Sequence, residues 1–316
     1  MQKYIAKRLI TAIPVLFMIS IGAFLMVNLT PGNPAELYVT PDATAEQIAA
    51  TERALGLDQP LPIQYISWLG RALTLDFGNS FSTRYAVLPI VVSRLVPTVI
   101  LMGSTLLFSY IVAIPLGIIS ARKQGTWIDN LLTGGSFVGV SIPNFFLGLG
   151  LIYIFAVQLG WFPTGGMIEL GSSGGFFEVV HHLVLPVFVL SAFYIANMAR
   201  YMRSTMIQVY GENYMRTATA KGLAEKTILS KHGLRNALIP VITVIGTDLP
   251  RLVGGAIVTE QIFQWPGLGR LTITAIQQRD YPILMAVTIL SAVVVLAANL
   301  LVDIMYAVVD PRIKYN

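Results

Sequence analysis

Six long apolar runs constrain this chain more than any other feature of its sequence. A helix needs about 20 mainly apolar residues to cross the roughly 30 Å of hydrocarbon in a bilayer. The runs that meet or approach this length are Leu9–Leu29, Leu95–Ser120, Leu131–Leu159, Leu183–Ala199, Ala237–Thr259 and Ile283–Val302. Charges occur only inside the fifth run, at Asp248 and Arg251. The pattern predicts an all-α membrane protein with six transmembrane helices.

Composition supports a membrane protein and excludes several other classes. Apolar residues make up 55% of the chain and charged residues only 12%, whereas soluble domains have about 25% charged residues. Cysteine is absent, which excludes disulfides, thiolate metal sites and a cysteine nucleophile. The net charge of +5 could indicate nucleic acid, but the basic residues cluster at the ends of the apolar runs. We therefore expect a lipid bilayer and no nucleic acid as the partner of these residues.

The first run is predicted to be an uncleaved span rather than a signal peptide. Its apolar part is longer than the usual h-region of about 7–15 residues, and no small-x-small cleavage site follows it. Lys and Arg then give the orientation of the chain, because cytoplasmic loops carry more of them. Fourteen fall on the side of the two termini and six on the opposite side. Both termini are therefore predicted to be cytoplasmic, in a bacterial-type plasma (inner) membrane.

These assignments divide the chain into four parts. They are the N-terminus and first span (1–29), an external loop with short helices (30–94), a five-span core (95–307) that includes a cytoplasmic loop (200–236), and a cytoplasmic tail (308–316). In the external loop, Thr44 and Gln47 have the spacing of a capping box, and Gly56 can end the helix that follows. An amphipathic stretch, Ile63–Leu75, comes next. The loop is either a cap on the membrane surface or a docking site for an external partner.

The cytoplasmic loop between the fourth and fifth runs is the most charged part of the chain. Its basic residues are Arg200, Arg203, Arg216, Lys221, Lys226, Lys231 and Arg235. Asn213 is predicted to cap a short helix, Tyr214–Lys221, which Gly222 ends. A second helical stretch, Glu225–Leu238, is predicted to run into the fifth span. Two interpretations stay open from the residues alone: a knob whose small Ala218 and Ala220 let a partner approach, or a solvated connector whose charges set topology.

Motifs that would make the chain an enzyme are missing. There is no His-Glu-x-x-His zinc helix, no Gly-x-Ser-x-Gly elbow and no phosphate-binding P-loop. Leu55–Asp58 faintly resembles an intramembrane aspartyl protease motif, but it lies in a polar external loop. His181 and His182 are adjacent, about 100° apart on a helix, and poorly placed to share a metal. We predict no catalytic residue, no metal site and no cofactor in this chain.

Several segments resemble one family of membrane proteins. Tyr214–Leu223, Lys231–Pro240, Glu260–Arg270, Arg279–Pro282 and Val309–Tyr315 are similar to motifs of the permease subunits of peptide and oligopeptide ATP-binding-cassette importers. Pro31–Pro34 and Asp76–Ser80 match features of the external loop in the first of two paired permeases. The resemblance covers nearly the whole chain and implies a type I importer-like permease fold with a cytoplasmic coupling helix between spans four and five.

The resemblance also implies partners and functional residues. The expected partners are a second homologous permease, two ATPase subunits that bind ATP and Mg, and an extracytoplasmic peptide-binding protein. The implied coupling residues, which would enter a groove on the ATPase, are Tyr214, Arg216, Thr217, Ala218, Lys221, Gly222 and Leu223. The broader superfamily begins this motif with Glu-Ala-Ala, where Arg216, Thr217 and Ala218 stand here, so a Glu-based salt bridge to the ATPase is not expected. Ala224 stands where a Ser cap is expected, which predicts a loose start for the second helix.

Asp248 and Arg251 are the unexpected charges of the fifth run. Charges inside a span usually face a partner or an aqueous path, and these two lie three residues apart on one helical face. They either line the substrate path or form a structural ion pair. Peptide is the substrate that the resemblance favours. Other small solutes (a nickel chelate, glutathione or a sugar), a self-sufficient ion-coupled carrier and an intramembrane enzyme are the alternatives.

Overall fold

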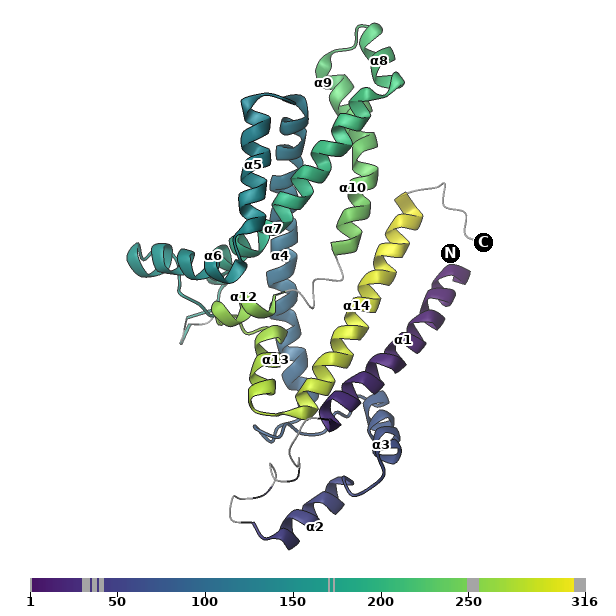
Figure 1. The fold of residues 1–316 in the computed structure, drawn as a ribbon, viewed down its shortest axis with the longest axis vertical. Helices are drawn as coiled ribbons and strands as arrows, with labels where there is room; N and C mark the ends of the chain where they lie inside the picture. The colour runs from purple at the N-terminus through teal and green to yellow at the C-terminus, as the bar shows by residue number, and fades with distance from the viewer. Residues whose placement is uncertain are drawn as a thin grey trace.

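The computed structural model describes residues 2–29, 35, 39, 43–169, 171–172, 174–248 and 256–309. Within them, regular structure is helical apart from one isolated bridge between Asn79 and Ala86. The molecule is elongated, with α2 and α3 at one end and α8 and α9 at the other (Figure 1). The prediction of an all-helical chain is confirmed.

The helices fall into long apolar ones and short ones at the two ends of the molecule. In chain order they are α1 (Gln2–Asn28), α2 (Ala45–Leu55), α3 (Leu61–Leu73), α4 (Val87–Arg122), α5 (Trp127–Ser141), α6 (Asn144–Leu151), the π-helix η2 (Ile152–Gln158), α7 (Phe176–Gly211), α8 (Asn213–Ala220), α9 (Glu225–Thr227), the π-helix η3 (Ile228–Leu234), α10 (Arg235–Asp248), α12 (Ile257–Ile262), α13 (Leu268–Gln277) and α14 (Tyr281–Val309).

The centre of the molecule is the packing of α4 against α7, each 36 residues long. The two backbones approach closely at Gly117, where a Cβ atom would lie 2.6 Å from Cβ of Met202 and 2.7 Å from the carbonyl oxygen of Ala199. Small residues allow this approach between helices in a bilayer, where close packing replaces the hydrophobic effect. Ala237 and Val241 of α10 complete the buried cluster on this side.

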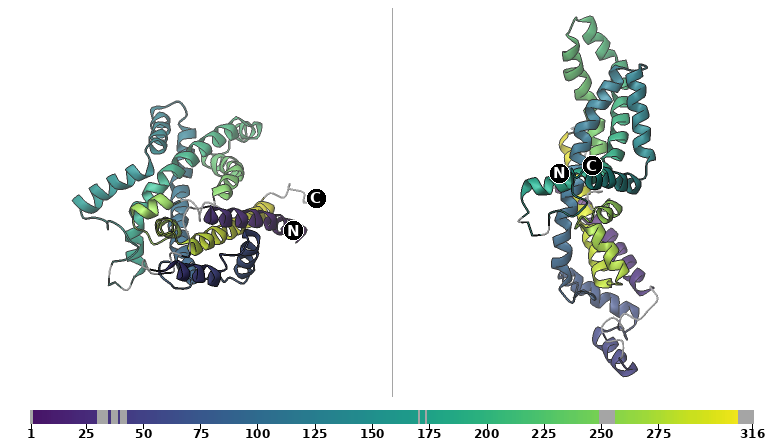
Figure 2. Two further views of the ribbon diagram at one scale, coloured as in Figure 1. Left: turned by 60° about the horizontal axis from the view of Figure 1, so that its bottom comes forward. Right: turned by 90° about the vertical axis from the view of Figure 1, so that its left-hand side faces the viewer.

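The first and last helices form a second unit beside this centre. α1 and α14 lie side by side (Figures 1 and 2), and Arg8 Nη2 pairs with Asp303 Oδ1 at 3.0 Å. At the other end of α1, α3 packs across it, because Trp68 is buried against Phe24 with ring centroids 6.1 Å apart. The Tyr65 hydroxyl also hydrogen-bonds with Ser20 Oγ at 2.7 Å. α3 is therefore fixed to the C-terminal half of α1.

Local signals in the external loop act as predicted. The Thr44 side chain accepts from the Gln47 amide, and the Gln47 side chain accepts from the Thr44 amide, so the capping box starts α2. Gly56 ends this helix in the left-handed conformation, with φ of 70°. In α3, which the sequence predicts to be amphipathic, Trp68 faces inward, whereas the apolar Ile66 is exposed.

The third apolar run is not one straight span, contrary to the prediction. Its helices α5 and α6 meet at an angle of 96°. The residue before a proline disfavours helical backbone, and Ile142, before Pro143, is extended with φ −82° and ψ 121°. The proline then opens α6, where it is tolerated. The continuous apolar composition of Leu131–Leu159 conceals this break.

The number of crossings is lower in the described residues than the six predicted. Four helices are long and apolar enough to span a bilayer, and five if the bent pair counts as one span. These four are α1, α4, α7 and α14. Of the predicted fifth span, Ala237–Thr259, α10 covers the part up to Asp248 and α12 begins at Ile257, while 249–255 lie outside the described residues.

Candidate functional site

The short helix α8 lies at the tip of the molecule and begins where α7 ends. Glu212 has extended backbone with φ −70° and ψ 145°, and α8 starts at Asn213 without a side-chain cap. The predicted N-cap, Asn213, is instead the first helical residue, and Glu212 stands at the cap position. Helix ends fray, and their bounds shift by one or two residues with the definition used. The predicted helix itself is therefore confirmed.

The end of α8 is closed by a glycine motif, as predicted. Gly222 has φ of 70°, its amide donates to the Thr219 carbonyl at 3.0 Å, and the Leu223 amide donates to the Ala218 carbonyl at 3.4 Å. These two bonds define a Schellman motif, which satisfies the last carbonyls of a helix and favours glycine at the left-handed position. The chain then turns back, and Ala224 precedes α9 without a side-chain cap.

One face of α8 is anchored to the rest of the chain. Met215 and Ala218, three residues apart, are buried, and Met215 belongs to one cluster with Met202 and Met206 of α7. Gly233 of η3 lies against this cluster, since a Cβ atom there would be 3.7 Å from Met215 Cε. Ala218 therefore packs inward and does not face a partner, unlike the prediction for its small side chain. Flexible methionine side chains fill such irregular contacts readily.

Most other residues of α8 and of the turn after it are exposed. The predicted coupling residues Tyr214, Arg216, Thr217, Lys221, Gly222 and Leu223 are all exposed. Burial of part of the Tyr214 ring raises the pKa of its phenol, with the charge of Glu212 acting in the same direction. The phenol therefore stays protonated at neutral pH and can donate a hydrogen bond.

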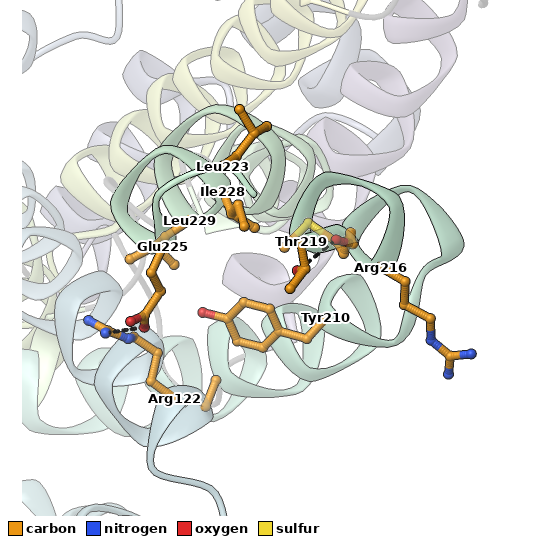
Figure 3. Close-up of a pocket in the computed structure, with 10 residues that line it drawn as sticks. Arg122, Tyr210, Arg216, Thr219, Leu223, Glu225, Ile228 and Leu229 are labelled. Carbon is orange, nitrogen blue, oxygen red and sulfur yellow. Dashed lines mark hydrogen bonds and ion pairs between the residues drawn. The ribbon is translucent and has the colours of Figure 1, made fainter. Parts of the chain in front are cut away.

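A cavity of about 430 Å³ lies behind α8, between it, the end of α4 and the start of α9. Figure 3 shows Tyr210, Thr219 and Leu223 around this space, whereas the Arg216 side chain points away from it. Arg122 Nη2 pairs with Glu225 Oε1 at 2.5 Å across one edge. This exposed ion pair joins the end of α4 to the segment that follows α8. Sequence reasoning did not find it, because 103 residues separate the partners.

Two of the basic residues of the charged segment, Arg200 and Arg203, interact within the chain. Arg203 donates to both carboxylate oxygens of Asp129, at 2.6 and 2.7 Å, and Asp129 is only 3% exposed. Ser120 Oγ and the Gly125 amide also donate to this carboxylate. Arg200 lies over the Phe137 ring at 5.1 Å. These contacts fasten the α4–α5 turn to α7. Part of the positive charge in the segment 200–236 therefore stabilises the fold.

Asp248 is the last residue of α10 and is buried in the described chain. Its Oδ2 accepts a hydrogen bond from the Tyr110 hydroxyl of α4 at 2.9 Å. Arg251, the other charge predicted on the substrate path, lies outside the described residues, so their pairing stays a prediction. The Tyr110 contact shows how one carboxylate is accommodated in an apolar helix.

A fully buried carboxylate, Glu260, organises the short helices α12 and α13. Its oxygens accept from the Thr98 hydroxyl at 2.7 Å and the Arg270 amide at 3.1 Å. A Cβ atom at Gly267 or Gly269 would overlap this carboxylate, so only glycine fits at these positions. The carboxylate thus lies at the N-terminus of α13, where backbone amides favour negative charge. The sequence signal for this buried site is an acidic residue followed by Pro-Gly-x-Gly within the segment Glu260–Arg270.

A second buried carboxylate, Asp280, ties the external loop to the turn between α13 and α14. Its Oδ2 accepts from Ser80 Oγ at 2.5 Å, from Ser82 Oγ at 3.0 Å and from the Ser82 amide at 3.2 Å. Phe81 also packs edge-on against Tyr281, with ring centroids 6.1 Å apart. The matched segments Asp76–Ser80 and Arg279–Pro282 therefore belong to one site.

Histidines and acids do not form a metal centre in the part of the chain that the structure describes. His182 Nδ1 lies 3.1 Å from the carbonyl oxygen of Gly165, and His181 Nε2 lies 2.8 Å from that of Trp161. Both rings therefore hold the turn that contains Trp161 and Gly165 in place.

Two family models account for almost the whole chain. Residues 113–315 match the binding-protein-dependent transport system inner membrane component, and residues 1–102 match the N-terminal component of the same kind of membrane protein. The chain belongs to this family. It is an inner-membrane, multi-pass permease, and ATP hydrolysis takes place on separate subunits. The predicted absence of an own ATPase activity and of a cofactor accords with this family.

Curated relatives match this permease from end to end. It is 44% identical over 316 residues to the oligopeptide transport system permease protein AppB of Bacillus subtilis (strain 168), covering 100% of both chains. It is 41% identical over 316 residues to the glutathione transport system permease protein GsiC of Escherichia coli (strain K12), again covering 100% of both.

The fold of the permease is also similar to a solved importer. The inward-facing MetNI methionine ABC transporter (CY5 native crystal form) matches with a TM-score of 0.54 at 17% identity, covering 70% of this chain and 96% of that chain. At this identity the likeness concerns the fold alone. The predicted resemblance to importer permeases is confirmed, while the coupling residues of α8 stay a prediction.

Proposed function

We propose that this permease forms half of a translocation pathway that imports peptides, with oligopeptides as the substrate class. The proposal is supported by the full-length 44% identity to an oligopeptide permease. Glutathione is the second candidate, since a glutathione permease is 41% identical over its full length. The nickel chelate and the sugar considered from the sequence rank below these two, each of which matches a relative described above.

The coupling surface is the exposed face of α8. This assignment is supported by the structure of α8 and its surroundings. The short helix is anchored by Met215 and ended by Gly222, and it lies at one end of the molecule with Arg216 and Lys221 exposed. An ATPase groove that receives this helix transmits nucleotide-driven closure through Met215 to α7. Arg216 replaces the acid of the broader motif, so the matching ATPase surface offers acceptors rather than cations.

The full assembly contains a second homologous permease, two ATPase subunits and an extracytoplasmic peptide-binding protein. The chain crosses the membrane six times, with both termini in the cytoplasm. Two observations support this orientation: fourteen basic residues against six, and the directions of α1 and α14, whose terminal ends both lie toward the α8 side (Figure 1). A terminal tag labelled from outside on intact cells would contradict it.

Asp248 and Arg251 line the path of the substrate. The contact between Asp248 and Tyr110 joins α4 and α10 at a buried position, where a charge needs a partner or water. Asp248→Asn is then expected to assemble normally and to change the uptake of charged peptides relative to neutral ones. Loss of complex yield that Arg251→Gln restores, with unchanged substrate preference, would support a structural ion pair instead.

Uptake by the reconstituted complex tests the substrate class. The permease is co-expressed with its partner permease, ATPases and binding protein, and uptake of labelled peptides of three to five residues is compared with uptake of glutathione. Peptide uptake that depends on ATP and resists excess glutathione is the expected result. Efficient uptake of glutathione alone would assign the second candidate, and uptake without any ATPase subunit would contradict the importer.

A further inference from the structure

α3 lies beside the C-terminal half of α1, a helix long and apolar enough to cross the membrane (Figure 1). Tyr65 hydrogen-bonds with Ser20, and the Trp68 ring packs against Phe24. With the candidate span Ile5–Asn28 centred in the bilayer, a rise of about 1.5 Å per residue puts Ser20 ~5 Å and Phe24 ~11 Å beyond the midplane. The hydrocarbon extends about 15 Å from the midplane, so both contacts lie inside one leaflet. A tilt of α1 would bring them closer still to the midplane.

The side of α3 that points away from α1 carries an apolar stripe, made of Ile63, Ile66 and Leu73. At about 100° per residue these three fall within an arc of roughly 80°, on the side opposite Trp68. They are 52%, 67% and 78% exposed. Single exposed apolar residues are normal on a protein surface, but three on one face of a 13-residue helix form a continuous apolar surface. Such a surface marks a contact with a membrane or with another protein.

A polar stripe, made of Gln64, Ser67 and Arg71, follows a third side of the same helix. Their spacing of i, i+3 and i+7 brings them onto one face. The Gln64 amide donates to the carbonyl oxygens of Leu57 and Gln59, so it holds the turn before α3. Ser67 and Arg71 are exposed. α3 therefore has one face on α1, one apolar face and one polar face, an arrangement that suits a helix in the boundary between lipid and water.

The composition of the apolar stripe favours lipid over a protein partner. Protein interfaces are enriched in aromatic residues, methionine and arginine, whereas the stripe consists of isoleucine and leucine. Leu25 and Met26, in the same half of α1, are exposed apolar residues too. We propose that α3 is inserted into the leaflet that surrounds the C-terminal half of α1, with the apolar stripe in contact with acyl chains and the polar stripe toward the headgroups. Lipid then anchors the segment between α1 and α4 in addition to its contacts with α1.

Quenching of a fluorophore on α3 in the reconstituted importer complex tests this position. The chain has no cysteine, so Ile66→Cys and Leu73→Cys each add one site for a bimane label, and the complex with the natural chain gives the background of the partner subunits. The proteoliposomes contain either a phosphatidylcholine with a nitroxide on one acyl chain or iodide on both sides of the membrane. At positions 66 and 73 the lipid nitroxide should remove most of the fluorescence and iodide little of it. Ser67→Cys, on the polar stripe, is the matched control and should lose more fluorescence to iodide than either.

A charge placed in the apolar stripe gives a second measurement. Ile66→Asp brings a carboxylate into hydrocarbon, where a charge is costly, and because Ile66 is exposed the change leaves the internal packing of the chain in place. Combined with Leu73→Cys, it should open the bimane at position 73 to iodide, whereas Ser67→Asp with Leu73→Cys should not. Equal iodide quenching at 66, 67 and 73 would place α3 in water and overturn the proposal. Protection of 66 and 73 from both quenchers would overturn it as well, because a protein subunit would then cover the stripe.

Discussion

The two ends of the permease are held together by different kinds of contact. At the external end, Glu260 and Asp280 are fully buried carboxylates surrounded by hydroxyl and amide donors. Around α8 itself, methionine packing at Met215 and the exposed pair Arg122–Glu225 hold the short helix, while the buried Asp129–Arg203 contact at this end fastens the α4–α5 turn to α7. Buried charged hydrogen bonds are expensive to break, whereas exposed ion pairs contribute little and methionine contacts adapt. The external end is therefore a rigid frame, and α8, which the Asp129–Arg203 contact does not hold, can shift at low cost.

Such a difference suits a protein that receives a mechanical signal at one end. The π-helix η3 lies directly between α9 and α10 at the soft end, and π-helical turns often occur at functional sites. Movement of α8 can be taken up there without disturbing the carboxylate networks at the far end. The predictions below test each side of this comparison.

Removal of the Glu260 carboxylate should have the largest effect. Glu260→Ala leaves the buried Thr98 hydroxyl and the Arg270 amide without an acceptor, at about 1–3 kcal/mol each, and opens a cavity, so the expected total loss is about 3–5 kcal/mol. Yield and thermal unfolding of the complex in detergent measure it. Glu169→Ala, at an exposed position, serves as the control. An unfolding temperature like that of the control would mean that the external frame does not depend on this carboxylate.

Asp280→Asn should have a smaller and more local effect. The amide keeps one acceptor but brings donors toward Ser80 and Ser82, with an expected loss of about 1.5–3 kcal/mol. The loop between Phe77 and Ala86 should then open more often, and trypsin should cleave after Arg84 faster. Asp58→Asn, an exposed change in the same external segment, should leave the cleavage rate unchanged. Equal rates in the two variants would show that Asp280 does not hold the loop.

Gly222→Val tests the soft end through its backbone. A side chain at φ of 70° costs about 1–2 kcal/mol, and it should displace α8 without affecting the spans. We expect normal insertion and yield, but loss of ATP-driven uptake. Gly211→Val introduces the same side chain at the end of α7, in open space and without a positive φ, so uptake should persist. Unchanged uptake in Gly222→Val would refute the coupling role of α8.

The pair Arg122–Glu225 should give the smallest effect on stability. Its side chains are 45% and 78% exposed, so a double-mutant cycle with Arg122→Gln and Glu225→Gln is expected to yield about 1 kcal/mol or less. The coupling energy should fall further as salt is added. A cycle energy as large as the loss in Glu260→Ala would mean that the two ends do not differ in the way described.

Local sequence determined much of this protein. The lengths of the apolar runs predicted the four long helices, because a helix that crosses a bilayer needs about 20 mainly apolar residues in a row. Thr44, Gly56 and Gly222 set helix ends, because capping bonds reach only three to five residues along the chain. The sequence also shows directly that a P-loop and the other enzyme motifs are absent. The charged loop that contains α8 is equally plain in the sequence.

Only the tertiary structure decided which polar residues hold the molecule together. Thr98 meets Glu260 across 162 positions, Ser80 meets Asp280 across 200, and Arg203 meets Asp129 across 74. Such pairs depend on how the helices cross, which no local pattern encodes. The same reason explains the different outcome at Ala218, whose small side chain suited a partner surface but is buried within the chain. The bend at Pro143 had a local signal, but the apolar run around it had the same composition as a straight span.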